Sequence, residues 1–289
     1  MSDQAESLRN KLRARAGLIP HSSRIITVTS GKGGVGKSNF TLNFALGLQK
    51  RGYRVLVFDA DIGLANIDVL MGVSPKYHLH HLLRREKTVW EIIQKGYNGL
   101  EFIAGGSGFN DLVRLSEAEI DYFAEQIGLL NGYADFILFD TGAGLSKETL
   151  KFIVSANETI VVTTPEPTAI TDAYAIIKMV HSMDYRVDFR LVVNRITDAD
   201  EGRYTADKIR YVAKQFLNLD IPVLGYMPDD PNVTKAVKKQ IPFSHAFPNS
   251  PAARNMERLV DSFLSGQTAA APESGGIKGF MGKMLKLLK

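Results

Sequence analysis

The stretch RIITVTSGKGGVGKSNF, residues 24–40, decides the fold of this 289-residue chain. It begins with an apolar β-rich run, continues as a glycine-rich loop and opens into a helical pattern. The loop matches G-x-x-x-x-G-K-[ST] in the strand–loop–helix context that a phosphate-binding loop requires. Its glycines let backbone N–H groups turn inward around an anion, and the helix N-terminus adds partial positive charge. We therefore predict a nucleotide phosphate site, with Lys37 on the β- and γ-phosphates and the Ser38 hydroxyl on Mg²⁺.

Short runs rich in Val, Ile, Leu and Phe alternate with helical patterns throughout residues 24–264. Several runs are almost continuously apolar, as strands buried on both faces must be. The alternation predicts an α/β fold with a doubly wound, mostly parallel sheet and helices on both faces, and it disfavours two separate small domains. The expected strands are 24–29, 54–58, 100–104, 136–139, 159–163, 189–193 and 223–226, and the expected helices are 38–51, 116–130, 146–155, 168–183, 201–217, 230–239 and 251–264.

Composition divides the chain into four parts and excludes several classes of protein. We expect an N-terminal arm (1–22), an ATPase domain (23–264), a flexible linker (265–276) and a C-terminal helix (277–289). The net charge of +4 lies in the two tails, so the body is not basic as a whole, as a protein that grips nucleic acid with its whole body usually is, although a local basic patch could still exist. We do not expect a nucleic acid partner. Cysteine is absent, which excludes disulfides, Cys-ligated iron–sulfur clusters and a catalytic thiol. No apolar run approaches the roughly 18 residues of a transmembrane helix.

The second lysine of KGGVGKS, Lys32, gives the loop a more specific character. This loop resembles the deviant Walker A motif of the MinD and ParA family of ATPases. DADIG at 59–63 resembles the family's D-x-D segment, and DTGAG at 140–144 resembles its Walker B motif and switch. Asn194-Arg195 and the segment GYMPDD at 225–230 resemble its adenine-contacting loops. The resemblance covers about residues 24–264 and implies a P-loop NTPase fold, ATP and Mg²⁺ as ligands, and slow, dimer-dependent hydrolysis of ATP to ADP and phosphate.

The resemblance also implies roles for single residues. Asp61 would orient the attacking water and would act with Lys32 and Lys37 in catalysis. Asp140 and Ser38 would hold Mg²⁺, and Asp59 would support the ion indirectly. The nucleotide-binding residues would be Gly31, Lys32, Gly33, Gly34, Val35, Gly36, Lys37, Ser38, Asn39, Glu166, Asn194, Arg195, Pro228 and Asp229.

Lys32 has no role in an ordinary P-loop. In the family it reaches across a dimer interface to the partner's phosphates, so ATP would hold two subunits together. Glu166 aligns with a family carboxylate that touches the opposite nucleotide's ribose. Asn39 departs from the family's usual Ser or Thr, although an amide can still donate a hydrogen bond to a phosphate.

The C-terminal segment IKGFMGKMLKLLK separates apolar and basic residues onto two arcs at about 100° per residue. Its 13 residues would span about 20 Å as a helix, too short to cross a membrane, so we expect it to lie in an anionic membrane interface. A helix docked on the body is the alternative. If the helix lies in the membrane interface, Phe280→Asp or Leu285→Asp should release the protein from the membrane without changing monomer stability. The expected membrane residues are Ile277, Phe280, Met281, Met284, Leu285 and Leu288.

The N-terminal segment DQAESLR at 3–9 resembles the DQAxxLR motif of the FlhG group of MinD-like ATPases. That group governs flagellar number and placement, and its arm activates FlhF, a signal-recognition-type GTPase. The expected partner-activating residues are Asp3, Gln4, Ala5, Leu8 and Arg9.

Together these features predict an ATP-switched regulator of flagellar number and placement. It would be cytoplasmic and peripheral on the inner face of the cell membrane in the ATP state. Its partners would be a second copy of itself, FlhF, flagellar basal-body and C-ring components, and anionic lipid. A MinD-type division-site regulator is the first alternative, and a ParA-type DNA partition ATPase is the second.

Overall fold

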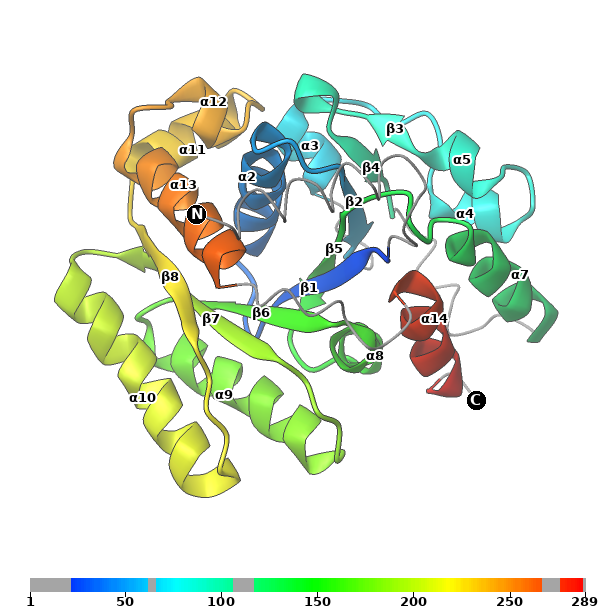
Figure 1. Ribbon diagram of the computed structural model, residues 1–289. Coiled ribbons are helices and arrows are strands. Elements are labelled where there is room, and N and C mark those ends of the chain that lie inside the picture. The colour runs from blue at the N-terminus through cyan, green and yellow to red at the C-terminus, as the bar shows by residue number, and fades with distance from the viewer. Residues whose placement is uncertain (1–21, 62–65, 106–116, 267–275, 288–289) are drawn as a thin grey trace, which may run out of the picture.

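The computed structural model describes residues 22–61, 66–105, 117–266 and 276–287 (Figure 1). An eight-stranded sheet runs through the molecule in the order β3-β4-β2-β5-β1-β6-β7-β8. All neighbouring strands pair in parallel except β3 and β4. The strands are β1 (Arg24–Ser30), β2 (Val55–Ala60), β3 (Gln94–Lys95), β4 (Glu101–Ile103), β5 (Phe136–Ala143), β6 (Glu158–Thr163), β7 (Phe189–Ile196) and β8 (Val223–Pro228).

Helices cover both faces of this sheet, because its central strands are apolar on both sides (Figure 1). One face carries α2 (Lys37–Lys50), α3 (Ile67–Met71), α11 (Pro231–Lys238), α12 (Phe243–Ala246) and α13 (Pro251–Ser265). The other face carries α4 (Leu79–Leu83), α5 (Val89–Ile92), α7 (Glu117–Gly128), α8 (Lys147–Ser155), α9 (Pro167–Ser182), α10 (Ala199–Leu217) and α14 (Gly276–Lys286). A 3₁₀ turn, η1 (Tyr97–Gly99), precedes β4.

The predicted fold class is confirmed, and each of the seven expected strands coincides with a strand of the sheet. Sequence patterns gave no sign of β3 or of the short helices α3, α4, α5 and α12. Each of these helices has only four or five residues, too few to display a helical period.

Helix α14 packs its apolar arc against the body, beside α7 and α8 (Figure 1). Ile277, Phe280, Met281 and Met284 are all buried. The Phe280 ring stacks on the Phe139 ring of β5 with 4.7 Å between centroids. The apolar arc that was expected to face lipid therefore packs on protein in this structure. The expectation that Phe280→Asp leaves the stability of the monomer unchanged does not hold. The Leu285 side chain and Leu288 are not among the parts of the chain that the structure describes. Among the described residues, no helix is both long and apolar enough to span a membrane.

The start of α14 touches the root of the N-terminal arm. Gly276 has φ of +52°, and a Cβ atom there would lie 2.5 Å from Ser22 Oγ and 2.8 Å from Asn131 Oδ1. Only glycine combines that backbone conformation with such close approach. The expected arm residues Asp3, Gln4, Ala5, Leu8 and Arg9 lie outside the described residues, and so does most of the expected linker.

Candidate nucleotide site

The glycine-rich loop crosses from the carboxyl end of β1 to the first turn of α2. Gly34 and Gly36 have φ of +79° and +91°, a left-handed conformation that favours glycine. Gly31 also packs tightly, because a Cβ there would lie 2.3 Å from the backbone carbon of Asp172 on α9. The loop is thus held in one shape, and α2 begins at Lys37 directly behind it. This is the strand–loop–helix arrangement that binds phosphate.

Lys37 and Asp140 form a buried ion pair below the loop. The Lys37 ammonium lies 3.1 Å from Asp140 Oδ1, and the Thr41 hydroxyl lies 2.8 Å from the same oxygen. Asp140 Oδ2 is buried, and no described residue donates a hydrogen bond to it. A buried carboxylate oxygen without a donor carries a large desolvation cost, so this atom is suited to a cation or its bound water.

Asp59 lies opposite Asp140 in the β2–β5 register and clamps the loop after β2. Its carboxylate accepts backbone N–H bonds from Asp61 at 3.3 Å, Asn66 at 2.9 Å and Ile67 at 3.1 Å. Burial, followed by the charge of Asp140, raises the pKa of Asp59 to about 7. The structure therefore gives Asp59 a role in holding both ends of the 61–67 loop; its support of Mg²⁺ stays a prediction.

Asp61 lies at the mouth of the phosphate pocket. A Cβ on Gly142 would lie 3.3 Å from Asp61 Oδ1, so the glycine lets the loop after β2 and the switch after Walker B approach closely. Burial raises the pKa of Asp61, and the Lys37 charge opposes that rise. Asp61 is half-buried rather than enclosed, and a carboxylate in this position can accept a hydrogen bond from a water in the pocket.

The phosphate pocket and a second pocket meet at the start of α2, where both are lined by Gly36 and Asn39. Among the predicted residues, the phosphate pocket is lined by Gly33, Gly34, Gly36, Lys37, Ser38, Asn39 and Asp61. The second pocket is lined by Gly36, Asn39, Asn194, Arg195, Pro228 and Asp229. The structure thus brings the expected phosphate and base residues into one continuous site.

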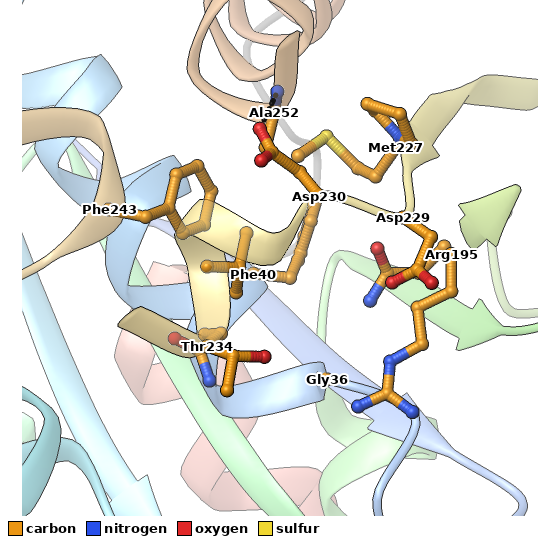
Figure 2. Close-up of a pocket in the computed structure, with 13 residues that line it drawn as sticks. Gly36, Phe40, Arg195, Met227, Asp229, Asp230, Thr234, Phe243 and Ala252 are labelled. Carbon is orange, nitrogen blue, oxygen red and sulfur yellow. Dashed lines mark hydrogen bonds between the residues drawn. The ribbon is translucent and has the colours of Figure 1, made fainter. Parts of the chain in front are cut away.

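Figure 2 shows the second pocket, with Arg195 and Asp229 on one side and Phe243 and Thr234 on the other. Asn194 donates its side-chain N–H to the Val35 carbonyl at 2.7 Å, which fixes the end of β7 to the phosphate loop. A Cβ on Gly36 would lie 2.4 Å from the same Asn194 nitrogen. The side-chain oxygen of this amide is left as an acceptor, as an adenine amino group requires.

Lys32 and Glu166 lie at the surface and contact each other within one chain. The Lys32 ammonium is 2.8 Å from Glu166 Oε2 and 3.1 Å from the Thr168 hydroxyl. The ammonium holds the pKa of the Glu166 carboxyl below its usual range. Neither residue lines either pocket, so the two residues expected to act across a dimer are here paired with each other.

Several residues at the site escaped sequence reasoning. These include Asn66, Ser146, Glu148 and Thr149, which line the phosphate pocket, whereas Gly142 and Ala143, which line it too, belong to the predicted switch. Thr41 and Thr168 contact the site residues Asp140 and Lys32. Thr41 carried a usable signal, because it lies one helical turn after Lys37 and therefore on the same helix face. The others come from separate elements, and no local spacing indicates them.

Mg²⁺ and a nucleotide fit the residues present. Gly33, Gly34 and Gly36 of the loop line the pocket, Ser38 offers a hydroxyl there, and Asp140 Oδ2 has no hydrogen-bond partner among the described residues. Among the described residues no cluster of three or more His, Cys, Asp or Glu forms a metal cage. That is consistent with an ion held mainly by phosphates, water and one or two side chains, as Mg²⁺ in nucleotide sites usually is.

Comparison with known sequences places this site in a family. Residues 21–264 match the ParA family, described as NUBPL iron-transfer P-loop NTPase. The flagellum site-determining protein YlxH of Helicobacter pylori is 37% identical over 271 residues, covering 92% of this chain and 91% of the relative. The antiactivator FleN of Pseudomonas aeruginosa is 34% identical over 266 residues, covering 92% and 95%. Because this chain has no cysteine, it offers no thiol ligands for the iron transfer that the family description names.

Two solved structures of MinD proteins have the same fold as this chain. The septum site-determining protein MinD complexed with Mg-ADP from Pyrococcus horikoshii matches with a TM-score of 0.69 at 26% identity, covering 84% of this chain and 98% of that one. MinD in the MinC:MinD complex of Aquifex aeolicus matches with a TM-score of 0.69 at 25% identity, covering 86% and 99%.

Proposed function

This chain belongs to the ParA and MinD family of P-loop ATPases, and from that premise we propose that it is an ATP-switched, dimerising, membrane-associated regulator of flagellar number and placement. The observation that carries the proposal is the similarity to YlxH and FleN. The alignments cover 91% and 95% of these two relatives. A MinD-type division regulator is the second candidate, because MinD of Neisseria meningitidis is also 30% identical over 251 residues. The N-terminal arm with its DQAESLR segment favours the flagellar role.

In this proposal, groups of the chain itself bind the phosphates and orient the attacking water. Backbone N–H groups of the loop and Lys37 bind the phosphates, and Lys37 leaves Asp140 to do so. Asp61 accepts a hydrogen bond from the attacking water and orients it toward the γ-phosphorus. The chemistry that Mg²⁺ supplies when bound is neutralisation of charge on the β- and γ-phosphate oxygens, with Ser38 and Asp140 as its protein partners.

Dimerisation completes the site in this proposal. Lys32 and Glu166 lie at the surface with side chains 42% and 56% exposed, so each is able to change partner. Exposed ion pairs contribute little to stability because water competes for both charges. The contact between Lys32 and Glu166 would therefore open readily when a second subunit presents its γ-phosphate, and ATP would join the two subunits.

Lys32→Ala is expected to bind ATP but to remain monomeric, because the lost charge acts on the partner's nucleotide. Multi-angle light scattering with ATP measures the dimer directly, and binding of a fluorescent ATP analogue shows whether the P-loop is intact. Lys235→Ala, at an exposed position outside the site, is the matched control. An ATP-dependent dimer of normal stability in Lys32→Ala would exclude the role across the interface.

The membrane half of the proposal rests on α14. Its exposed residues include Lys278, Lys283 and Lys286, while Ile277, Phe280, Met281 and Met284 are buried against the body. The same helix can leave its contacts with the body and bind in the interface of an anionic bilayer. There each lysine contributes about 1 kcal/mol to the free energy of membrane binding. The docked helix is then the cytosolic form, and the peripheral form on the inner face of the cell membrane is the one that ATP favours.

The arm carries the partner half of the proposal. Its residues precede β1 in the sequence, and none of them belongs to the motifs assigned to the ATP site, so the proposal has them act on FlhF without altering hydrolysis. Flagellar basal-body and C-ring components are proposed as further partners, since regulation of placement requires contact with the structure being placed.

Gln4→Ala is expected to abolish stimulation of purified FlhF GTPase activity while ATP turnover stays unchanged. Gln4 would enter the partner's catalytic site, and the arm precedes the first strand in the sequence and supplies none of the P-loop's residues. Gln49→Ala, a substitution at a surface position on α2, serves as the control and should stimulate normally. Loss of ATP turnover in Gln4→Ala would instead make the arm part of the ATPase fold.

A further inference from the structure

The hydroxyl of Thr41 is placed to orient Asp140. Thr41 and Asp140 are both fully buried, on α2 and β5. The Thr41 hydroxyl lies 2.8 Å from Asp140 Oδ1 and 3.0 Å from the Lys37 carbonyl oxygen. A hydroxyl has one proton, and an ionised carboxylate is the stronger acceptor, so the proton is directed to Asp140.

Two side chains of the described residues donate to Asp140, and both use Oδ1: Thr41 and Lys37. Oδ2 is buried without a donor. The two oxygens of the carboxylate are therefore not equivalent: one is anchored to α2, and the other is presented without a partner.

In the proposed function, nucleotide binding changes this arrangement, because Lys37 turns from Asp140 to the phosphates. Asp140 then keeps a single side-chain donor among the described residues, Thr41. A carboxylate with no anchor would rotate about its last bond and lose its orientation, whereas one anchored at Oδ1 continues to present Oδ2.

We propose that Thr41 is a positioning residue for Mg²⁺: its hydroxyl holds Asp140 Oδ1 once Lys37 has moved to the nucleotide, so that Oδ2 stays directed at the ion's water shell. This inference rests on the proposed assignment of Asp140 to Mg²⁺. Groups that orient a metal's ligands typically change metal affinity about 10–100-fold, so Thr41 should act on the contribution of Mg²⁺ to nucleotide affinity and not on the phosphate loop itself.

The test is the affinity of a fluorescent ADP analogue measured twice, with excess Mg²⁺ and with EDTA. Thr41→Val keeps the shape and removes the hydroxyl, and it should lower the Mg²⁺-dependent gain in affinity by about tenfold while leaving affinity in EDTA unchanged. Thr41→Ser restores the hydroxyl and should restore the gain. Thr27→Val is the matched control, because Thr27 is equally buried and its hydroxyl instead donates to the Phe152 carbonyl at 3.1 Å.

The outcomes separate this inference from the assignment beneath it. Asp140→Asn should lose the Mg²⁺-dependent gain. If Asp140→Asn loses it and Thr41→Val keeps it, the positioning role of Thr41 is wrong and the assignment of Asp140 stands. If Thr41→Val loses nucleotide affinity equally in Mg²⁺ and in EDTA, or if Thr41→Ser fails to restore the Mg²⁺-dependent gain in affinity, the Thr41 hydroxyl stabilises the fold and does not position Asp140 for Mg²⁺. If Asp140→Asn keeps the gain, the assignment and the inference both fail.

Discussion

Asp61→Ala is expected to bind ATP with normal affinity, to lose turnover by at least about two orders of magnitude, and to accumulate as the ATP-bound dimer. Orientation and proton acceptance by a placed side chain typically contribute 10²–10⁴-fold, so their loss is of about this size. The Asp61 side chain lines the phosphate pocket, and its backbone N–H, not its carboxylate, bonds to Asp59. Its removal therefore takes away the water's partner and leaves the phosphate contacts in place.

Lys37→Ala is the informative contrast, because the proposal assigns Lys37 to the phosphates, and this variant should lose binding as well as turnover. Affinity for an ATP analogue and steady-state phosphate release separate the two variants. Normal turnover in Asp61→Ala would show that another group orients the water, and loss of ATP binding in that variant would show that Asp61 instead supports the loop.

Phe280→Asp is expected to remove the membrane binding that the ATP state favours and also to displace α14 from the body. Phe280 is only 2% exposed and stacks on Phe139. Truncation of a buried Phe costs about 3–5 kcal/mol, and a buried carboxylate without a partner adds to that cost. Liposome sedimentation measures the first effect, and hydrogen exchange in β5 and α8 measures the second. Undiminished lipid binding would show that another surface holds the membrane.

Substitutions at two glycines of α14 would distinguish docking of the helix on the body from its binding to the membrane. Gly276→Ala should strain the docked helix, through its positive φ and its contact with Ser22 and Asn131, and so should raise lipid binding with ADP. Gly282→Ala has nothing within 4 Å of the added Cβ and serves as the control for increased helix propensity. Equal lipid binding by both variants would mean that docking does not compete with the membrane.

The sequence was most informative where structure is local. A strand, a glycine loop and a helix follow one another in residues 24–50, so the phosphate site could be predicted down to Lys37 and Ser38. The seven main strands were predictable because each is a short apolar run. Their carboxyl ends meet at one edge of a parallel sheet, which is why Asp59 and Asp61 converge with Asp140 although about 80 residues separate the two segments in the sequence.

Features that depend on pairing between distant segments were not predictable. The pattern of α14 shows an apolar arc, but an arc is the same whether lipid or protein covers it. The three backbone amides that donate to Asp59 and the contact between Lys32 and Glu166 arise from loop geometry, which leaves no periodic signal. Thr41 is one helical turn from Lys37, yet only the position of β5 shows what its hydroxyl reaches.

The central claim is that nucleotide state decides between the docked and the membrane-bound helix. An ATP dimer carries two helices, and the second binds at a high effective concentration once the first is inserted. The most direct measurement is sedimentation of the full chain with anionic liposomes in the presence of a non-hydrolysable ATP analogue or ADP. We expect the protein to pellet with the ATP analogue and to remain in solution with ADP, and raised salt should weaken the pelleting through screening of the lysines. Equal pelleting in both nucleotide states would contradict the account.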